Sequence, residues 1–400
     1  METVVQSLSP KWLDVRLNRL ARSRDFDPPP KRTKVEPMKK LLDVPATTDV
    51  FTKDLQEQRA IVILCSHLGR PKGKDAALSL APVAGRLGNL LGQEVYFAED
   101  CIGPVARDAV EAASPGRVVL LENLRFYKEE EANDPEFARQ LASLADVYVN
   151  DAFGTAHRAH ASTEGVTHYL PAVAGFLLEK EVRYLSALVA NPPKPFAAVI
   201  GGAKVSTKIP AIEHLLPKLD ILALGGGMAN TFLKAEGVNV QMSLVEDEQV
   251  AIAQRILARA REAGVEVLLP RDVVAASKFA ADAEARHVPV SQVTPGYMVL
   301  DIGPETVSAY AEALRRARAV IWNGPMGVFE MEKFSKGTFG VARALASLDA
   351  TTVVGGGETA QVVAELGLQN QFTHVSTGGG ASLEMLEGRE LPGVAALQDA

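Results

Sequence analysis

Short apolar runs alternate with helical stretches along most of the chain beyond about residue 60. In the first half the runs are Ala60–Leu64, Val95–Phe97, Val118–Leu121 and Val147–Val149, and helices are predicted over Pro82–Leu91 and Pro135–Leu144. Each run is continuously apolar, which is typical of strands that are buried on both faces. A repeated succession of strand and helix predicts a parallel sheet covered by helices on both sides.

The second half repeats this scheme after a long helix. Its apolar runs are Ala197–Ile200, Ile221–Leu224, Val265–Leu268, Val320–Trp322, Thr352–Val354 and Thr373–Ser376. The helix is predicted over Phe176–Ala190, and the loop Asn191–Pro195 with three prolines follows it. A helix that ends in such a loop suits a domain boundary and a hinge, although periodicity does not distinguish it from another layer helix. We therefore predict domains over 1–175 and 196–385 joined by a hinge helix and linker at 176–195, with the tail 386–400 packed on the first domain.

Adjacent glycines are absent from the first 200 residues and then occur in four runs. The runs are Gly201-Gly202, Gly225-Gly226-Gly227, Gly355-Gly356-Gly357 and Gly378-Gly379-Gly380. Each run follows an apolar or β-branched stretch, so a strand ends there in bare backbone. The free N–H groups of such a turn, together with the dipole of a following helix, favour an anion such as a nucleotide phosphate. Four runs in one half predict a phosphate-binding surface.

Composition narrows the class of protein. The chain has 400 residues, 47% hydrophobic and 23% charged, with a net charge of −7. These values fit a soluble enzyme and disfavour nucleic-acid binding, and no apolar run reaches the ~20 residues of a membrane helix. Only Cys65 and Cys101 are present, so a reduced compartment, the cytoplasm, is expected. An organellar transit peptide is the alternative, because four arginines lie within the first 24 residues.

Anion-binding side chains follow three predicted strands of the first half. The segments are Ser66–Pro71, Glu122–Phe126 and Asn150–His160. Ligands of an open parallel sheet bind outside the carboxyl ends of its strands, where these segments are expected to lie. Arginine forks and imidazoles there can hold phosphate or carboxylate oxygens. The alternative is that Arg125 and Arg158 are surface ion-pair partners and that His160 is bonded locally.

Lysine, amide and carboxylate groups follow the glycine-rich strands of the second half. Lys204 and Lys208 are four residues apart, a spacing that predicts one shared face near the start of the following helix. Asn323 and Glu330 follow another strand, and the carboxylate suits a pair of ribose hydroxyls. Glu358 and Thr359 follow the third glycine run, where a metal-bound phosphate would be well placed, although an acidic residue is common at any helix start. Walker A and dinucleotide-binding glycine patterns are both absent from the sequence.

Several long segments together closely resemble the phosphoglycerate kinase family. They are Ser66–Lys72, Leu121–Phe126, Asp151–Ser162, Gly201–Lys208, Trp322–Glu330, Gly355–Ala360 and His374–Glu384. The likeness runs from about Leu55 to the C-terminus. It implies two doubly wound, Rossmann-like parallel-sheet α/β domains that close by a hinge. The N-terminal domain would bind 3-phosphoglycerate or 1,3-bisphosphoglycerate, and the C-terminal domain would bind ADP or ATP with Mg²⁺, in a monomer.

The resemblance also implies a role for each matching residue. The phosphoglycerate side would consist of His67, Leu68, Gly69, Arg70, Arg125 and Arg158. The nucleotide side would consist of Lys208, Asn323, Glu330, Gly356, Gly357, Glu358 and Thr359. Lys204 would contact the phosphoryl group in transfer, with Arg158 as the second catalytic residue, and Glu358 would meet the metal. The family usually has Asp in place of Glu358.

The N-terminal 60 residues depart from the family pattern. The family has a strand that runs into Asp-Phe-Asn-x-Pro, and the nearest string here begins with Asp25 and has Asp27 in place of the Asn. Three prolines exclude a helix or a central strand at 25–32. The family also has an arginine between this string and His67; Arg32 and Arg59 are the only arginines there, and neither has the family's spacing. Arg32 is placed with Asp25 and Asp27 among the expected substrate-binding residues. This departure leaves three alternatives: a rebuilt loop, a corrupted stretch of sequence, or a catalytically impaired paralogue that still binds nucleotide.

Overall fold

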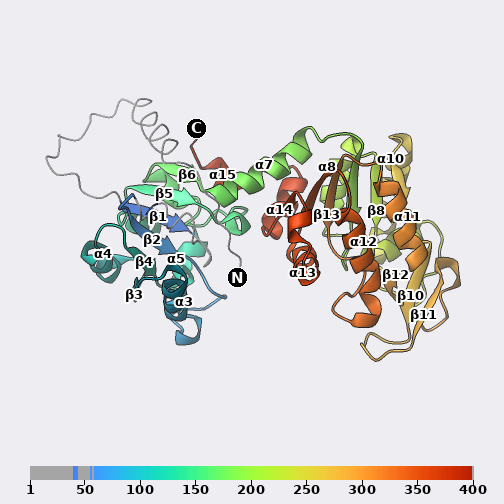
Figure 1. Ribbon diagram of the computed structural model, residues 1–400, viewed down its shortest axis with the longest axis horizontal. Helices are drawn as coiled ribbons and strands as arrows, with labels where there is room; N and C mark the ends of the chain where they lie inside the picture. The colour runs from blue at the N-terminus through green and yellow to red at the C-terminus, as the bar shows by residue number, and fades with distance from the viewer. Residues whose placement is uncertain (1–38, 44–54, 56–57, 399–400) are drawn as a thin grey trace. The chain divides into compact units, whose positions relative to one another are not determined.

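The chain divides into two compact units, each built around its own sheet (Figure 1). The computed structural model describes residues 39–43, 55 and 58–398. The first unit is Met1–Glu181 with Glu390–Ala400, and the second is Val182–Arg389. The division therefore falls inside helix α7, Phe176–Ala190, which has the bounds that the sequence predicted.

The first unit contains a six-stranded parallel sheet in the order β3-β4-β2-β1-β5-β6. Its strands are β1 Lys39–Asp43, β2 Ile61–Cys65, β3 Val95–Ala98, β4 Val118–Leu121, β5 Val147–Asn150 and β6 Ala172–Ala174. Among its described residues, besides the start of α7, its helices are α3 Ala81–Leu91, α4 Gly103–Ala112, α5 Lys128–Glu131, α6 Pro135–Ala142 and α15 Pro392–Ala395. The parallel α/β prediction is confirmed. The sequence did not predict β1, whose Leu41 and Leu42 are too short an apolar run to stand out, nor β6, which has only three residues.

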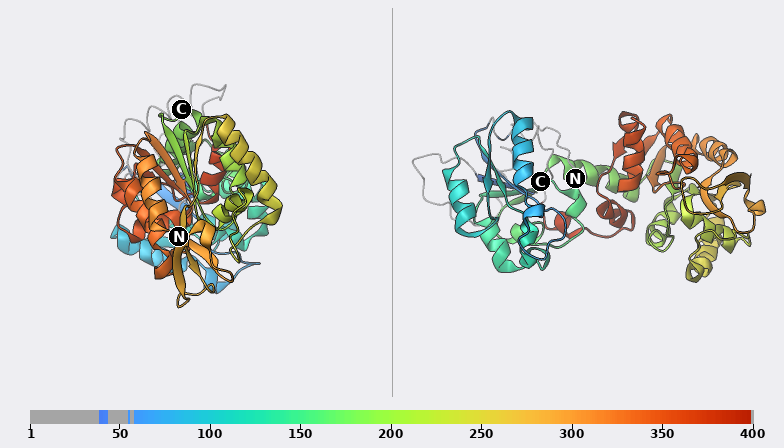
Figure 2. Two further views of the ribbon diagram at one scale, coloured as in Figure 1. Left: turned by 90° about the vertical axis from the view of Figure 1, so that its right-hand side faces the viewer. Right: turned by 90° about the horizontal axis from the view of Figure 1, so that it is seen from below.

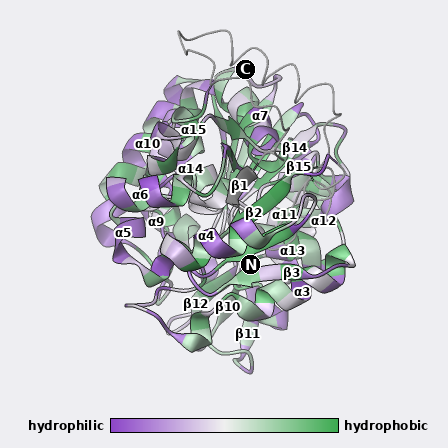
Figure 3. Ribbon diagram, turned by 90° about the vertical axis from the view of Figure 1, so that its left-hand side faces the viewer, coloured by the Kyte–Doolittle hydropathy of each residue, from purple (hydrophilic) through white to green (hydrophobic). Residues whose placement is uncertain are grey.

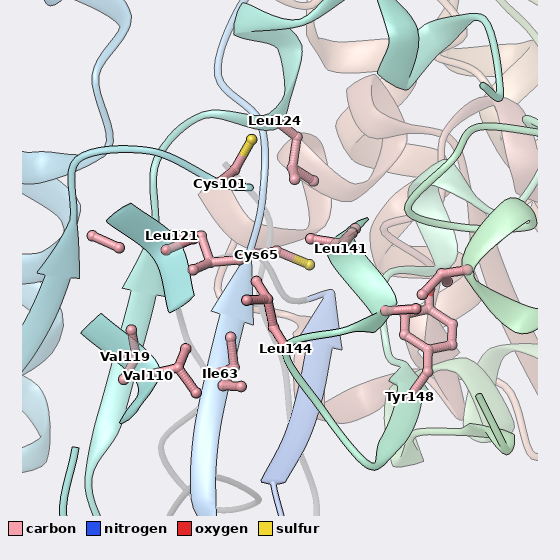
Figure 4. Packing of buried hydrophobic residues seen from close by; sticks show 14 of the residues in the cluster. Ile63, Cys65, Cys101, Val110, Val119, Leu121, Leu124, Leu141, Leu144 and Tyr148 are labelled. Atoms are coloured by element: carbon pink, nitrogen blue, oxygen red, sulfur yellow. The ribbon is translucent and has the colours of Figure 1, made fainter. Parts of the chain in front are cut away.

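Both faces of this sheet are buried, as the continuous apolar strands indicated. Ile61, Ile63 and Cys65 of β2 belong to the cluster in Figure 4, and Val62 and Leu64 belong to the cluster on the other face. Successive strand residues point to opposite faces, so an all-apolar strand needs a core on each side. Figure 3 shows the matching polarity, with β2 hydrophobic and α5 and α6 carrying hydrophilic residues.

The second unit contains a second parallel sheet in the order β15-β14-β13-β7-β8-β9. Its strands are β7 Phe196–Ile200, β8 Ile221–Leu224, β9 Glu266–Leu268, β13 Ala319–Asn323, β14 Thr351–Gly355 and β15 His374–Val375. Its longer helices are α8 Ile209–Leu215, α9 Gly226–Ala235, α10 Val250–Glu262, α11 Pro304–Leu314, α12 Lys336–Ala346, α13 Gly357–Glu365 and α14 Gly380–Leu386. Figure 2 shows helices on both sides of these strands.

A three-stranded antiparallel sheet in the second unit was not predicted. It consists of β10 Asp272–Ala276, β11 Ala285–Pro289 and β12 Met298–Ile302, in the order β11-β10-β12. The edge strand β11 carries Arg286 and His287 and is mostly exposed. The charged, solvent-facing β11 lacks the apolar run on which the sequence argument relied, whereas β10 and β12 contain such residues and were overlooked.

Two connections tie chain segments to the end of β5. Asp151 Oδ1 accepts the N–H groups of Leu177 at 2.7 Å and Leu178 at 3.2 Å, which fixes the first turn of α7. The C-terminal segment packs on the same unit through Gly393, whose N–H donates to the Ala156 carbonyl at 2.8 Å and whose carbonyl accepts from Asn150 Nδ2 at 3.1 Å. Within the part of the chain that the structure describes, no helix is long and apolar enough to cross a membrane.

Candidate functional site

The three strand-end segments of the first unit lie together, and a buried asparagine joins two of them. Asn123, directly after β4, uses its amide for four hydrogen bonds. Its Nδ2 donates to the carbonyls of Leu68 at 2.8 Å and Leu78 at 2.9 Å, and its Oδ1 accepts from the N–H of Leu68 at 3.3 Å and of Arg125 at 3.1 Å. The backbone of Leu68 is therefore engaged with Asn123, which gives Leu68 a scaffolding part in holding His67 and Arg70.

Arg125 is buried, with part of its guanidinium left without a partner. Nη1 donates to the carbonyl of Gly69 at 3.0 Å, and Nε lies 3.3 Å from Glu131 Oε1. Nη2 is buried and has no hydrogen-bond partner among the described residues. A buried charged donor costs free energy unless an acceptor meets it, so this nitrogen indicates where a ligand oxygen would bind. A surface ion-pair role for Arg125 does not fit this burial.

Cationic groups gather around Arg125. Burial and then the charges of Arg125 and Arg158 lower the pKa of His67 from 6.5 to about 4. The pKa of His160 is also lowered to about 4, by burial and then by the same two arginines. Arg70, exposed at the end of its segment, is near enough to lower the pKa of Arg125 after the larger effect of burial. Lowered histidine pKa values of this kind mark a concentration of positive charge that a bound anion would offset.

The second unit places Lys208 and Asn323 together. Lys208 Nζ donates to Asn323 Oδ1, and burial lowers the pKa of this lysine. Asn323 Nδ2 is buried and without a hydrogen-bond partner among the described residues, and it faces the turn at Gly355. An unsatisfied amide donor beside an ammonium group suits a phosphate oxygen.

The expectation that Lys204 and Lys208 share a helix face is wrong. Helix α8 begins at Ile209, so both lysines precede it in a turn, where the Lys208 N–H donates to the Val205 carbonyl at 2.8 Å. Pro210 at the second helical position sets this late start, since proline lacks an N–H and is favoured only in the first turn. Lys204 is exposed, whereas Lys208 is half-buried.

The turn at the start of α13 carries the remaining candidates. Gly356 is the N-cap residue, with a φ of 90° that a larger residue would adopt only with strain, and Gly357 begins the helix. Glu358 is exposed in the first turn of α13. Thr359 is fully buried, and its hydroxyl accepts the N–H of Gly324 at 2.7 Å, so it joins this turn to the end of β13. Glu330 is exposed in the loop that follows β13.

The glycine runs divide into two groups. Three of the four runs lead directly into helices α9, α13 and α14. At Gly201 a Cβ atom would lie 2.1 Å from the Pro325 carbonyl, and at Gly226 one would lie 2.7 Å from the backbone of Gly202. The first two runs therefore let the loops after β7, β8 and β13 approach closely. At Gly357 of the third run and Gly379 of the fourth a Cβ atom would meet nothing within 4 Å, so both of these runs leave open space beside the backbone for a ligand.

Comparison with known proteins agrees with this geometry. The sequence model of the family described as phosphoglycerate kinase matches residues 20–389. The chain belongs to the phosphoglycerate kinase family. It is 60% identical over 346 residues to phosphoglycerate kinase from Moorella thermoacetica, covering 86% of this chain and 88% of that one. It is 54% identical over 388 residues to phosphoglycerate kinase from Pelotomaculum thermopropionicum, covering 97% and 98%.

Solved structures show the same relationship. Phosphoglycerate kinase from Coxiella burnetii has a TM-score of 0.80 at 41% identity, covering 90% of this chain and 96% of that one. Phosphoglycerate kinase from Pyrococcus horikoshii has a TM-score of 0.79 at 31% identity. Membership makes the chain a phosphotransferase with a carboxyl-group acceptor. The alternative of a catalytically impaired paralogue receives no support from these matches.

The position of strand β1 in the sheet adds one candidate substrate-binding residue to those that the family resemblance implied. Asp25, Asp27 and Arg32 lie outside the described residues. Strand β1 ends at Asp43, which pairs in register with Cys65 of β2 and Asn150 of β5. Asp43 is therefore at the carboxyl edge of the sheet, where the family has a strand that runs into an acidic motif. Sequence reasoning missed this residue, although the string Leu-Leu-Asp-Val-Pro at 41–45 carries a usable signal.

Proposed function

We propose that the chain catalyses the reversible transfer of a phosphoryl group from 1,3-bisphosphoglycerate to ADP, giving 3-phosphoglycerate and ATP. The observation that carries the proposal, beyond family membership, is the cationic cluster of the first unit. The charges of Arg125 and Arg158 there lower the pKa values of His67 and His160 after the larger effect of burial, and Arg125 Nη2 lacks an acceptor among the described residues. A small, highly charged anion such as phosphoglycerate satisfies both features.

The two units would divide the substrates between them. We assign phosphoglycerate to the first domain (1–175, with the tail 386–400) and nucleotide to the second (196–385), with the helix and linker at 176–195 as the hinge. Closure would bring the substrates together and exclude water that would otherwise hydrolyse the acyl phosphate. We also propose that the enzyme is a monomer and that it lies in the cytoplasm. The location is supported by the wheat relative, which is named as cytosolic, whereas the Arabidopsis relative is named as chloroplastic.

The chemistry requires positioning more than proton transfer. In the ATP-forming direction the leaving group is a carboxylate, which needs no proton, so no general acid is required. Lys204 would stabilise charge on the phosphoryl group in transfer, with backbone N–H groups at the start of α13. Lys208 and Asn323 would hold nucleotide phosphates, and Glu330 the ribose.

The turn at the start of α13 would offer Mg²⁺ one protein carboxylate, that of Glu358. The described residues contain no group of three or more His, Cys, Asp or Glu side chains that could hold a metal by themselves. Glu358 is exposed beside the open backbone of Gly357. Mg²⁺ commonly takes one or two carboxylates and completes its shell with phosphate oxygens and water. Bound in this way, the ion would neutralise charge on the nucleotide phosphates.

A coupled assay tests the proposed function. Purified protein with 1,3-bisphosphoglycerate, ADP and Mg²⁺ is expected to form ATP with a kcat on the order of 1–100 s⁻¹ or faster, the range of phosphoryl-transfer enzymes. ADP affinity is measured alongside by calorimetry. Normal ADP binding with ATP formation at background would contradict the proposal and favour the impaired paralogue.

Binding of 3-phosphoglycerate is expected to draw protons onto His67 and His160. In the free protein both pKa values are about 4, so both imidazoles are neutral at pH 5.5. A bound anion would offset the repulsion from Arg125 and Arg158 and raise both pKa values, so protons are taken up between about pH 4 and pH 6. Histidine NMR titrations with and without ligand measure the shift, with sodium chloride at equal ionic strength as the control. Unchanged or lower values with bound ligand would count against this site.

A further inference from the structure

Glu130 in α5 is buried outside the candidate site, yet it bonds to the two residues that directly follow the third segment of that site. Its Oε2 accepts the N–H of Ser162 at 3.0 Å, and its Oε1 accepts the Ser162 hydroxyl at 2.6 Å. Its backbone carbonyl accepts the N–H of Ala161 at 2.9 Å. Ala161 and Ser162 directly follow His160 in the chain. One residue therefore makes three hydrogen bonds to the segment that carries Arg158 and His160.

We propose that Glu130 is a positioning residue for phosphoglycerate binding, which holds Arg158 and His160 at the anion site through Ser162. The inference rests on the proposed function, because it assigns the work of Glu130 to the phosphoglycerate side. Arg125 and Glu130 lie five residues apart in one segment after β4. The contact between Glu130 and Ser162 therefore links the segment after β5 to the segment after β4, which carries Arg125. In the sheet, strands β2 and β1 separate β4 from β5.

A purely structural role explains this carboxylate poorly. Glu130 is only 3% exposed, and a buried carboxylate is costly compared with an apolar side chain of similar size. A hydrophobic residue would fill the space at lower cost, whereas a carboxylate presents a separate oxygen to each of the two donors of Ser162. The second unit contains the same contact on its own phosphate-site loop. Glu246 accepts the N–H of Ser206 at 2.9 Å and its hydroxyl at 2.6 Å, between Lys204 and Lys208.

The charge state of Glu130 gives the inference a measurable signature. Burial raises the pKa of Glu130 from 4.5 to about 7, against the opposing hydrogen bonds from Ser162. The charge of Arg125 lowers the pKa of Glu130, and the charge of Glu131 raises it. His160 Nδ1 lies 3.8 Å from Glu130 Oε1. Protonation of the Glu130 carboxylate removes one of its hydrogen-bond acceptors, so its hydrogen bonding to Ser162 weakens as the pH falls through about 7. The two nearby histidines, with pKa values of about 4, stay neutral in this range.

The test compares the wild type with Glu130→Gln between pH 6 and pH 8. The neutral amide keeps the shape and loses one acceptor, so at pH 8 the KM for 3-phosphoglycerate is expected to rise about tenfold. The KM for ATP is expected to change less than about twofold, because the second unit is untouched. At pH 6 the wild type is itself protonated, so the ratio of the two KM values for 3-phosphoglycerate should shrink towards one. The ratio also removes the titration of the substrate phosphate, which both proteins share.

Glu136→Gln is the matched control, since Glu136 is exposed in α6 and pairs only with its helix neighbours Arg139 and Gln140. It should match the wild type throughout. If Glu130→Gln does not fold, Ser162→Ala, which removes only the hydroxyl bond, should show the same selective rise at about threefold.

The outcomes separate the two proposals. A selective, pH-dependent rise in the KM for 3-phosphoglycerate supports the inference. An active wild type beside a variant whose KM values are unchanged, or change equally for both substrates, overturns the inference alone. A wild type that neither binds 3-phosphoglycerate nor forms ATP overturns the proposed function and this inference with it.

Discussion

Lys204→Ala is expected to lower kcat about 100- to 1,000-fold, the loss typical of removing one charge that stabilises a transition state. Lys204 is exposed, whereas Lys208 already donates to Asn323 beside the glycine turn. In the proposed mechanism Lys208 would therefore hold bound nucleotide, and the exposed Lys204 would contact the phosphoryl group as it moves. An interaction made only in the transition state lowers kcat and leaves substrate binding nearly unchanged.

Steady-state kinetics with ADP and 1,3-bisphosphoglycerate measure this split, and calorimetry gives the affinity for ADP. The affinity is expected to change less than about threefold. Lys278→Ala provides the control, because Lys278 is an exposed lysine of the same unit that pairs with Asp282. A defect of Lys204→Ala that lies mainly in ADP affinity would contradict the assigned role. It would indicate that Lys204, like Lys208, binds the ground state.

Most strands of the two parallel sheets could be predicted because burial on both faces leaves a continuous apolar run. The predicted run Val118–Leu121 coincides with β4, and Phe176–Ala190 coincides with α7. The strands β1 and β6 and the three strands of the antiparallel sheet were missed, although β10 contains the apolar run Val-Val-Ala-Ala. β11 is exposed and charged, and β1 is held in the middle of its sheet by pairing with β2 and β5, although its own apolar content is small. Long-range backbone pairing of this kind leaves no trace in local periodicity.

The site could be predicted as a set of strand-end residues, since the carboxyl ends of parallel strands share one edge. Which polar groups serve the ligand and which hold the loops could not be read from the sequence. Thr359 and Leu68 look like ligand contacts in a motif, but hydrogen bonds engage them with Gly324 and Asn123. Glu130 looks like an ordinary acidic residue in a run of three, and only its contact with Ser162 distinguishes it from its neighbours. These assignments depend on pairs of residues far apart in the chain.

Arg125→Lys is expected to raise the KM for 3-phosphoglycerate about 10- to 100-fold, because one or two charge-assisted hydrogen bonds are lost. Lysine keeps the positive charge but has no planar fork. It cannot bond to the Gly69 carbonyl, as Nη1 does, and also offer the buried donor that Nη2 provides. The KM for ATP should stay within about twofold of the wild type. Arg139→Lys, at an exposed arginine of the same unit paired with Glu136, is the matched control.

A second substitution at the same position separates geometry from charge. Arg125→Gln also removes the positive charge, which contributes to the lowered pKa values of both His67 and His160. In Arg125→Gln the pKa values of His67 and His160 are expected to rise above about 4. In Arg125→Lys, which keeps the positive charge, both pKa values are expected to remain close to about 4. Histidine NMR titrations of the two variants measure this difference. If Arg125→Lys binds 3-phosphoglycerate as tightly as the wild type, the site needs only the charge of Arg125. The unpartnered Nη2 would then lose its assigned part in recognising the substrate.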